Sequence, residues 1–163
     1  MELWDAYNRN FERIEGRFLI RGEPIPNGLY HLVCDVLVKH TDGTYLLMKR
    51  AMNKLFGGMW EASAGGSALS GEDPLQCAKR ELFEETGIVS SELKAVGRLS
   101  NRDTVFVEYL CITSCAKDGI VLQEGETTAY RWVSREELLC MRKDELATDR
   151  IQRFIPELTS PLK

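Results

Sequence analysis

The order of apolar and polar residues predicts a chain made mostly of strands. Six segments rich in apolar or β-branched side chains are expected to be strands: residues 29–39, 44–50, 60–64, 93–100, 104–115 and 128–133. His40-Thr41-Asp42-Gly43 separates the first two, and its Asp-Gly pair predicts a hairpin. The fourth and fifth form a second hairpin-like pair. Residues 3–7 and 11–14, on either side of Asn8-Arg9-Asn10, predict a small additional hairpin.

One helix has clear start and stop signals. Asp73 is its expected N-cap, Pro74 occupies the first helical position, and Gln76 is placed to bond back to the cap. Gly87 is expected to end the helix in a left-handed conformation. Three apolar residues share one stripe and should pack on a core: Leu75, Ala78 and Leu82.

Two shorter helices are predicted near the C-terminus. Ser134 and Glu137 form a capping box that opens a helix ending near Met141. Thr148 is a candidate cap for a further helix, although Pro156 interrupts it. Four apolar residues would lie on one face of that helix: Ile151, Phe154, Ile155 and Leu158. Mixed strands with helices on either side indicate an α/β fold, and no internal boundary divides residues 1–163, so we expect one domain.

Composition excludes some classes of function. The net charge of −4 over 163 residues offers no electrostatic reason to expect nucleic-acid binding. No apolar run approaches the ~20 residues that a membrane helix needs, so no membrane association is expected. The five cysteines form no CxxC pair, and the polar start MELWDAYNRN does not resemble a signal peptide. We therefore expect reduced thiols and a cytoplasmic protein.

The chemistry is concentrated on the central helix. Glu81, Glu84 and Glu85 lie at positions i, i+3 and i+4 and share one face. Like charges at this spacing weaken a helix unless a cation lies among them, and oxygen ligands alone suit Mg²⁺ or Mn²⁺. A solvated acidic face is the alternative, but it leaves Arg80 and the preceding glycine pair at residues 65–66 unexplained. Cys77 falls on the same face and is expected to have no catalytic role.

Residues 66–88, GSALSGEDPLQCAKRELFEETGI, resemble the Nudix box, glycine-x5-glutamate-x7-Arg-Glu-aliphatic-x-Glu-Glu-x-Gly-aliphatic. Every specified position is filled: Gly66, Glu72, Arg80, Glu81, Leu82, Glu84, Glu85, Gly87 and Ile88. The resemblance implies a Nudix α/β/α sandwich, with a mixed sheet between helices. It also implies a metal-dependent hydrolase that cleaves diphosphate linkages by attack of metal-activated water.

The resemblance also implies roles for individual residues. Glu84 and Glu85 would be the principal metal ligands, and Glu81 would be the third acid and a candidate general base. The carbonyl of Gly65 would join the metal shell. Arg80 would orient a carboxylate of the set, with Glu72 as its expected partner.

Residues outside the box are expected to complete the site. Lys49, Arg50 and Lys54 correspond to basic residues that hold the diphosphate in isopentenyl-diphosphate isomerase-like members of the superfamily, and this resemblance makes Arg50 and Lys54 the candidate diphosphate contacts. Adjacent strand residues face opposite ways, so one of Lys49 and Arg50 should be the solvent end of its strand, and Arg50 is the one expected at the phosphate. Glu126, just before the last strand, is a candidate additional metal ligand, with a solvated turn as the alternative. Glu108 faces either the site or water. Two aromatic residues, Phe56 and Trp60, flank the box, and Trp60 is expected in the core rather than under a base.

The first 90 residues also resemble isopentenyl-diphosphate isomerase and its hydrolase relatives within the Nudix superfamily, through WDAYNRN, RGEPIPNGLYHL and LLMKRA. This raises allylic isomerisation as a rival function. The isomerase's catalytic Cys and metal-binding His align with Gly65 and Ser67, which supply neither group. His31 matches another of its metal histidines, although a structural role is the alternative. We therefore expect no isomerase activity.

The expected substrate is a small-molecule diphosphate, namely a nucleoside di- or triphosphate or a nucleoside diphosphate derivative. A non-catalytic nucleotide-binding module is a further alternative, but such a module would normally show erosion of the Arg-Glu-x-x-Glu-Glu core, which is intact here. The sequence leaves open a homodimer and the identity of the nucleotide.

Overall fold

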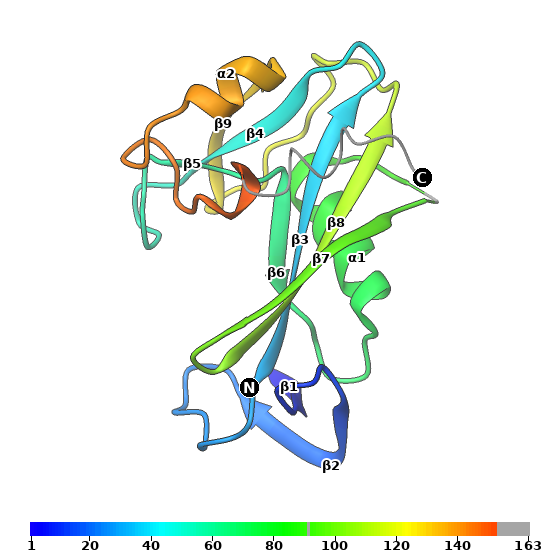
Figure 1. Ribbon diagram of the computed structural model, residues 1–163, viewed down its shortest axis with the longest axis vertical. Helices are drawn as coiled ribbons and strands as arrows, with labels where there is room; N and C mark the ends of the chain where they lie inside the picture. The colour runs from blue at the N-terminus through cyan, green and yellow to red at the C-terminus, as the bar shows by residue number, and fades with distance from the viewer. Residues whose placement is uncertain (91, 153–163) are drawn as a thin grey trace.

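A computed structural model describes residues 1–90 and 92–152 (Figure 1). The elements follow one another along the chain as β1 (Leu3–Tyr7), β2 (Arg13–Ile20), β3 (His31–His40), β4 (Tyr45–Arg50), β5 (Trp60–Glu61), β6 (Ala64–Ser67), α1 (Pro74–Thr86), β7 (Lys94–Asn101), β8 (Thr104–Thr113), β9 (Thr127–Val133) and α2 (Arg135–Cys140). Within these residues, no helix has the length and apolarity of a membrane-spanning segment. Apart from differences in their bounds, the first two predicted helices and all predicted strands except the one at residues 60–64 are confirmed.

β3 is the centre of the larger sheet, whose strands run in the order β5-β4-β3-β8-β7 (Figure 1). It pairs in parallel with β8 over its whole length, from His31↔Thr104 to His40↔Thr113. β9 joins the sheet beside β4, and both predicted hairpins are antiparallel pairs. The sheet is therefore mixed, as expected.

β3 changes partner on its other edge. Near its C-terminal end it pairs with β4 at Lys39↔Tyr45, whereas its middle pairs with β6 from Val33 to Val36. β4 and β6 therefore leave β3 at different points, and the sheet forks between them. This fork opens one side of the sheet next to α1.

Ser63 occupies the fork and corrects one prediction. The single strand expected over residues 60–64 is wrong, because β5 and β6 are separated at residues 62–63. The buried Ser63 hydroxyl accepts a hydrogen bond from the Val38 amide at 2.7 Å and donates one to the Leu46 carbonyl at 2.7 Å. These two backbone groups lie where the β3–β4 ladder ends. A side chain thus replaces the missing strand-to-strand bonds.

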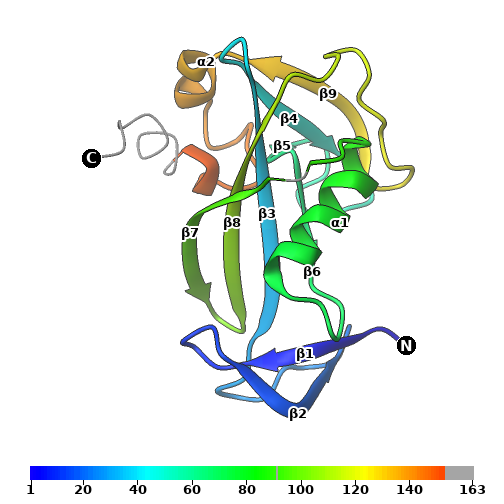
Figure 2. The same ribbon diagram turned by 90° about the vertical axis from the view of Figure 1, so that its right-hand side faces the viewer.

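Side chains of β3 alternate between two hydrophobic clusters, and α1 lies along one face of the sheet (Figure 2). Cys34 and Val36 belong to the core that also contains Ala78 and Leu82 of α1. On the opposite face, Leu37 packs in a second cluster with Leu138 of α2 and with Ile151. Helical segments therefore cover both faces of the sheet, and the expected sandwich is confirmed.

The central helix begins and ends as predicted. Asp73 accepts a hydrogen bond from the Gln76 amide, the Gln76 side chain accepts one from the Asp73 amide, and Gly87 has φ 75°. One core prediction is wrong, since Leu75 is 38% exposed. The buried stripe instead contains Cys77, Ala78, Glu81, Leu82, Glu85 and Thr86. Leu75 lies beside this stripe, in the first turn.

The N-terminal hairpin is present, but its second strand is longer than predicted and reaches Ile20. It is attached to the Nudix-box loop through the buried carboxylate of Asp5. This carboxylate accepts hydrogen bonds from the Ser70 hydroxyl and the Gly71 amide, both at 2.9 Å, and from Arg13 at 3.2 Å. The hairpin therefore supports the loop that leads into α1.

The predicted C-terminal helix lies only partly within the described residues. Residues 150–152 are helical, and the Thr148 hydroxyl accepts a hydrogen bond from the Arg150 amide at 3.2 Å. Ile151 faces the core as predicted. Phe154, Ile155, Pro156 and Leu158 lie outside the described residues.

Replacement of Ser63 by Ala is expected to destabilise the fold strongly, because the buried Val38 amide and Leu46 carbonyl would both lose their partner. We expect the free energy of unfolding to fall by roughly 2–6 kcal/mol, from about 1–3 kcal/mol for each of the two unpaired groups. Urea unfolding measures the change. Ser114→Ala, which removes the same atoms from an exposed position, is the control, and an equally small effect of both variants would contradict the role of Ser63.

Candidate active site

An acidic cleft of about 430 Å³ opens between α1, β6 and the loops that follow β4 and precede β9. It is lined by all eight residues that the sequence nominated: Arg50, Lys54, Gly65, Arg80, Glu81, Glu84, Glu85 and Glu126. α1 presents the three glutamates of the box, and Arg50 and Lys54 lie at the end of β4 and in the loop after it. The fold therefore brings together residues that are up to 76 positions apart, from Arg50 to Glu126.

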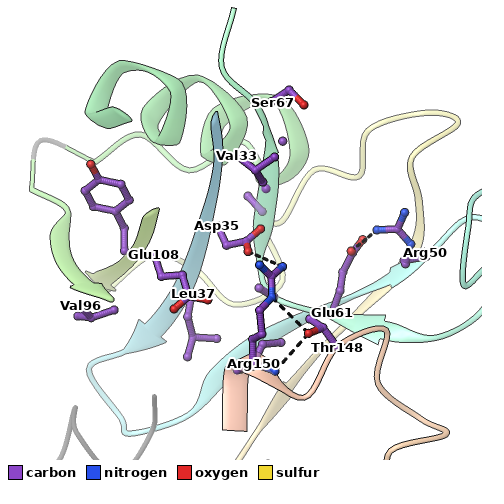
Figure 3. A pocket seen from close by; sticks show the side chains of 16 residues that line it. Val33, Asp35, Leu37, Arg50, Glu61, Ser67, Val96, Glu108, Thr148 and Arg150 are labelled. Carbon is purple, nitrogen blue, oxygen red and sulfur yellow. Dashed lines mark hydrogen bonds and ion pairs between the residues drawn. The ribbon is translucent and has the colours of Figure 1, made fainter. Parts of the chain in front are cut away.

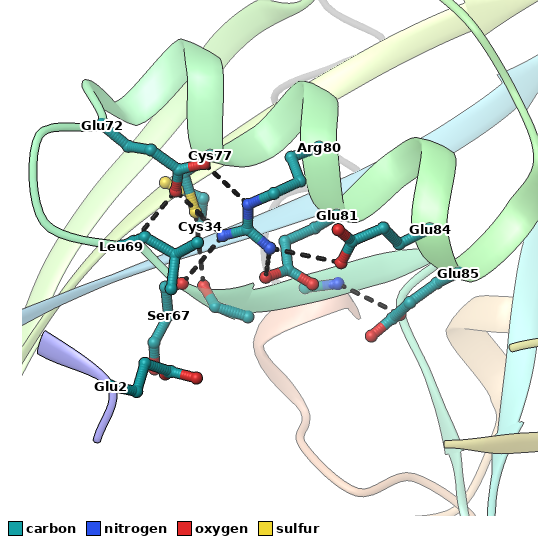
Figure 4. A network of polar contacts seen from close by, with 12 residues as sticks. Glu2, Cys34, Ser67, Leu69, Glu72, Cys77, Arg80, Glu81, Glu84 and Glu85 are labelled. Atoms are coloured by element: carbon teal, nitrogen blue, oxygen red, sulfur yellow. Dashed lines mark hydrogen bonds and ion pairs between the residues drawn. The ribbon is translucent and has the colours of Figure 1, made fainter. Parts of the chain in front are cut away.

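Arg80 is the centre of the polar network along α1 (Figure 4). Its guanidinium donates to both oxygens of Glu72, at 2.6 and 2.9 Å, and to Glu81 at 2.6 Å. It also donates to Glu84 at 3.3 Å and to the Ser67 carbonyl at 3.1 Å. The expected contact between Arg80 and Glu72 is therefore present. It ties the box loop to the helix that carries the acids.

The network separates the pKa values of its carboxyl groups. Burial alone would raise the pKa of Glu72, but hydrogen bonds from Arg80 and from the Leu69 amide lower it. Burial raises the pKa of Glu81, although Arg80 opposes this shift. The ionised form of Glu72 is therefore favoured beside Arg80, whereas burial disfavours the ionised form of Glu81.

Among the carboxyl groups of the cleft, Glu85 has the most strongly raised pKa. Burial, followed by repulsion from Glu61 and Glu81, raises its pKa to about 9. Its Oε2 accepts a hydrogen bond from the Gly65 amide at 3.3 Å. The protonated form is therefore favoured at neutral pH until a cation enters the cleft.

The two glycines of β6 let side chains approach from both faces of the strand. A Cβ at Gly66 would lie 2.3 Å from Glu81 Oε1, and a Cβ at Gly65 would lie 2.3 Å from Asp35 Oδ1. Successive residues of a strand point to opposite faces, so Glu81 and Asp35 are on opposite sides of β6. The Gly-Gly pair thus leaves room for one carboxylate on each side.

Each basic residue on the facing rim is paired with an acid. Arg50 forms an ion pair with Glu61 and donates to the Leu55 carbonyl at 2.7 Å, and Lys54 forms an ion pair with Glu126. Lys49 instead lies 5.8 Å from the centre of the Trp60 ring. Arg50 lines the cleft and Lys49 does not, whereas the phosphate contact of Arg50 stays a prediction. Glu126 lies in a turn and its partly exposed side chain also lines the cleft.

Other candidates do not line this cleft. His31 stacks on Trp4 with ring centroids 4.6 Å apart, and burial lowers its pKa, which fits its structural alternative. Trp60 packs against the second core cluster and has the Arg131 guanidinium 4.4 Å from its ring centre. Phe56 is exposed. Glu108 lines a second cavity instead, on the far side of β6.

Several residues that line the two cavities were missed by sequence reasoning, among them Asp35, Glu61, Thr148 and Arg150. The sequence did contain a feature that could have identified Asp35. It is the only charged residue between His31 and Val38 and, like Glu108, it interrupts an apolar strand. The parallel register places these two acids side by side. Arg150 had no local signal, since its position depends on how residues 146–151 return to the sheet.

The donor set of the cleft fits a hard divalent cation. Its side-chain donors are carboxylates, which Mg²⁺ and Mn²⁺ prefer, and two of them are buried on α1 with raised pKa values. In the part of the chain that the structure describes, no three His, Cys, Asp or Glu side chains converge on one point. Arg80 and Lys54 instead hold Glu81, Glu84 and Glu126 in ion pairs.

Glu85→Gln is expected to change the pH dependence of stability in metal-free protein. Folding raises the Glu85 pKa from 4.5 to about 9, so between these values the folded state holds a proton that the unfolded chain has released. The free energy of unfolding therefore falls as the pH rises through this window, by up to about 1.4 kcal/mol for each pH unit. The variant should lack this fall. Urea unfolding in EDTA between about pH 5 and pH 9 measures it.

Glu136→Gln, on the exposed side of α2, is the matched control and should retain the wild-type pH dependence. Equal pH slopes for wild type and Glu85→Gln would show that the Glu85 carboxyl is not protonated in the cleft.

Comparisons with known proteins agree with this geometry. The NUDIX domain model matches residues 29–158. An uncharacterized Nudix hydrolase of Listeria monocytogenes, lmo0368, is 37% identical over 145 residues, which are 87% of this chain and 85% of that protein. The crystal structure of DR0079 from Deinococcus radiodurans has a TM-score of 0.78 at 16% identity, covering 98% of this chain and 100% of the other.

The NUDIX domain of Shewanella oneidensis NrtR, in complex with ADP ribose, has a TM-score of 0.66 at 22% identity, covering 80% of this chain and 89% of the other. The family match spans most of the chain, and it coincides with the intact box and the acidic cleft. The chain therefore belongs to the Nudix family and is a hydrolase of pyrophosphate linkages.

Proposed function

We propose that the protein hydrolyses a diphosphate linkage in a nucleoside di- or triphosphate, or in a nucleoside diphosphate derivative, with Mg²⁺ or Mn²⁺ as its cofactor. The observation that carries the proposal is that one cleft is lined both by the box glutamates and by two basic residues that could contact a diphosphate. The box glutamates lie on α1, and Arg50 and Lys54 lie on the facing rim. A diphosphate between them would have a metal-binding surface on one side and hydrogen-bond donors on the other.

The proposed metal ligands are Glu81, Glu84, Glu85, Glu126 and the carbonyl of Gly65. The metal, when bound, would neutralise phosphate oxygens and promote ionisation of the attacking water. Glu81 is the candidate general base, although the acids of the cleft leave this assignment open. Arg80 would act by positioning, because its guanidinium already holds Glu81 and Glu84.

Binding of a metal diphosphate would replace the ion pairs of the cleft by contacts with the metal and with the phosphate groups. Lys54 pairs with Glu126 and Arg50 pairs with Glu61 in the structure. A metal diphosphate would offer the cation that Glu126 needs and the anion that Lys54 and Arg50 need. The charges would therefore remain compensated throughout, which limits the desolvation penalty of closing the cleft around them.

The nucleotide part of the proposal is supported by the ADP ribose complex of the NrtR domain. The intact box argues against a module without catalysis. Gly65 and Ser67 argue against the isomerase, since neither can replace a thiol acid or an imidazole ligand. We further propose one domain over residues 1–163 and a cytoplasmic location, which is supported by five free cysteines.

Glu84→Gln is expected to lower turnover by at least ~10²-fold, comparable to the loss of a catalytic acid or base. Glu84 is 42% exposed, so the neutral amide should leave folding intact. Phosphate release is measured with Mg²⁺ over nucleoside triphosphates, nucleoside diphosphate sugars, ADP ribose and isopentenyl diphosphate. EDTA should abolish the activity.

Glu136→Gln serves again as the control and should keep the wild-type rate. Wild-type rates in both Glu84→Gln and Glu85→Gln would refute the metal assignment. Formation of dimethylallyl diphosphate from isopentenyl diphosphate, above the rate with metal alone, would favour the isomerase instead.

A further inference from the structure

A second cavity, of about 240 Å³, lies on the other side of β6 from α1 (Figure 3). It shares five lining residues with the acidic cleft: Arg50, Glu61, Gly65, Gly66 and Ser67. The two spaces therefore meet along β6 and around Arg50 and Glu61. A substrate whose diphosphate lies in the cleft can extend its remaining part into this second cavity.

The cavity has apolar walls and a polar floor. Val33 and Leu37 of β3 contribute apolar surface from one side, and Ile151 contributes it from another. Asp35, which lies between the first two on the same face of β3, forms an ion pair with Arg150 at 2.7 Å. Apolar walls with a few fixed polar groups are typical of small-molecule sites.

Arg150 is held in place from three directions. One nitrogen of its guanidinium contacts Asp35, the group lies 3.9 Å from the centre of the Phe106 ring, and its Nε donates to the Thr148 hydroxyl at 3.3 Å. Its Nη1 is buried and has no hydrogen-bond partner among the described residues. A preorganised guanidinium with an unused donor fits a ligand that supplies an acceptor.

The size and polarity of the cavity restrict what it can take. Its volume is below the roughly 300–1,000 Å³ of sites for drug-sized ligands, so it suits one compact ring system. A hydrocarbon chain would leave Arg150 Nη1 unpaired and further remove the Asp35–Arg150 pair from water, which is unfavourable. A ring with a carbonyl or ring-nitrogen acceptor would satisfy that donor.

We propose that this cavity binds the organic part of the diphosphate substrate, and that Arg150, oriented by Asp35, selects a compact polar ring with a hydrogen-bond acceptor over an aliphatic group. The inference rests on the proposed function, because it places the diphosphate in the acidic cleft. Nucleosides are the class of ligand that combines such a ring with a diphosphate. Asp35 and Arg150 are then residues that determine specificity.

Calorimetric titration with non-hydrolysable probes and Mg²⁺ tests the inference without turnover. The probes are the α,β-methylene diphosphates of adenosine, guanosine, cytidine and uridine, together with methyl methylenediphosphonate and its five-carbon alkyl analogue. The methyl probe fills only the acidic cleft. We expect at least one nucleoside probe to bind about tenfold tighter than the methyl probe or more, and the alkyl probe to gain less than about threefold.

Arg150→Gln and Asp35→Asn are expected to reduce the nucleoside advantage to less than about threefold, while the affinity for the methyl probe changes less than about twofold. Arg150→Lys keeps the charge but loses the planar group, and should recover only part of the advantage. Arg142→Gln makes the same change at an exposed arginine paired with Asp144 at 3.0 Å, and should bind every probe as wild type does. Thermal unfolding identifies any variant that does not fold, and Asp35→Asn, which keeps its shape, then provides the test.

The outcomes separate this inference from the proposed function. Binding of the methyl probe with no gain from any nucleoside, or an equal gain from the alkyl group, would overturn the inference and leave the hydrolase proposal standing. Retention of the full nucleoside advantage in both Arg150→Gln and Asp35→Asn would also overturn it. A lack of Mg²⁺-dependent binding of any probe would refute the proposed function and this inference together.

Discussion

The site depends on the fork in the sheet at β3. A strand has only two edges for hydrogen bonds, and one edge of β3 is fully used by β8. On the other edge β3 serves two partners, β4 and β6, one after the other. Ser63 makes this possible, because its hydroxyl satisfies the Val38 amide and the Leu46 carbonyl where the strands diverge. Without such a replacement, the fork would leave buried polar groups unpaired.

The fork places the acidic cleft on one side of the short strand β6 and the second cavity on the other. β6 has glycine at both central positions, so the Glu81 carboxylate approaches it from α1 and the Asp35 carboxylate approaches it from the opposite side. Gly65 and Gly66 line both the acidic cleft and the second cavity, so β6 borders the two spaces.

The charges of the cleft are organised as exchangeable pairs. Arg50 pairs with Glu61, Lys54 with Glu126, and Arg80 with Glu72 and Glu81. The Arg80 pairs join the box loop to α1 through several hydrogen bonds and hold the two together. The Arg50 and Lys54 pairs lie on the opposite rim of the cleft. Burial and its acidic neighbours raise the pKa of Glu85 to about 9, which favours its protonated form at neutral pH. The cleft is thus short of positive charge, and a divalent cation would supply it.

The sequence by itself determined the family, the central helix and the Nudix-box residues of the acidic cleft. This information is local: the cap at Asp73, the left-handed Gly87 and the glutamate spacing follow from helix geometry, and Arg50, Lys54 and Glu126 reached the cleft as expected. Only the tertiary structure decided that Leu75 is exposed, that residues 60–64 break at Ser63, and that Arg150 meets Asp35. These outcomes depend on which strand or segment arrives beside a residue from far along the chain. The periodicity and spacing of residues do not predict these long-range neighbours, because they depend on how the whole sheet forks and packs.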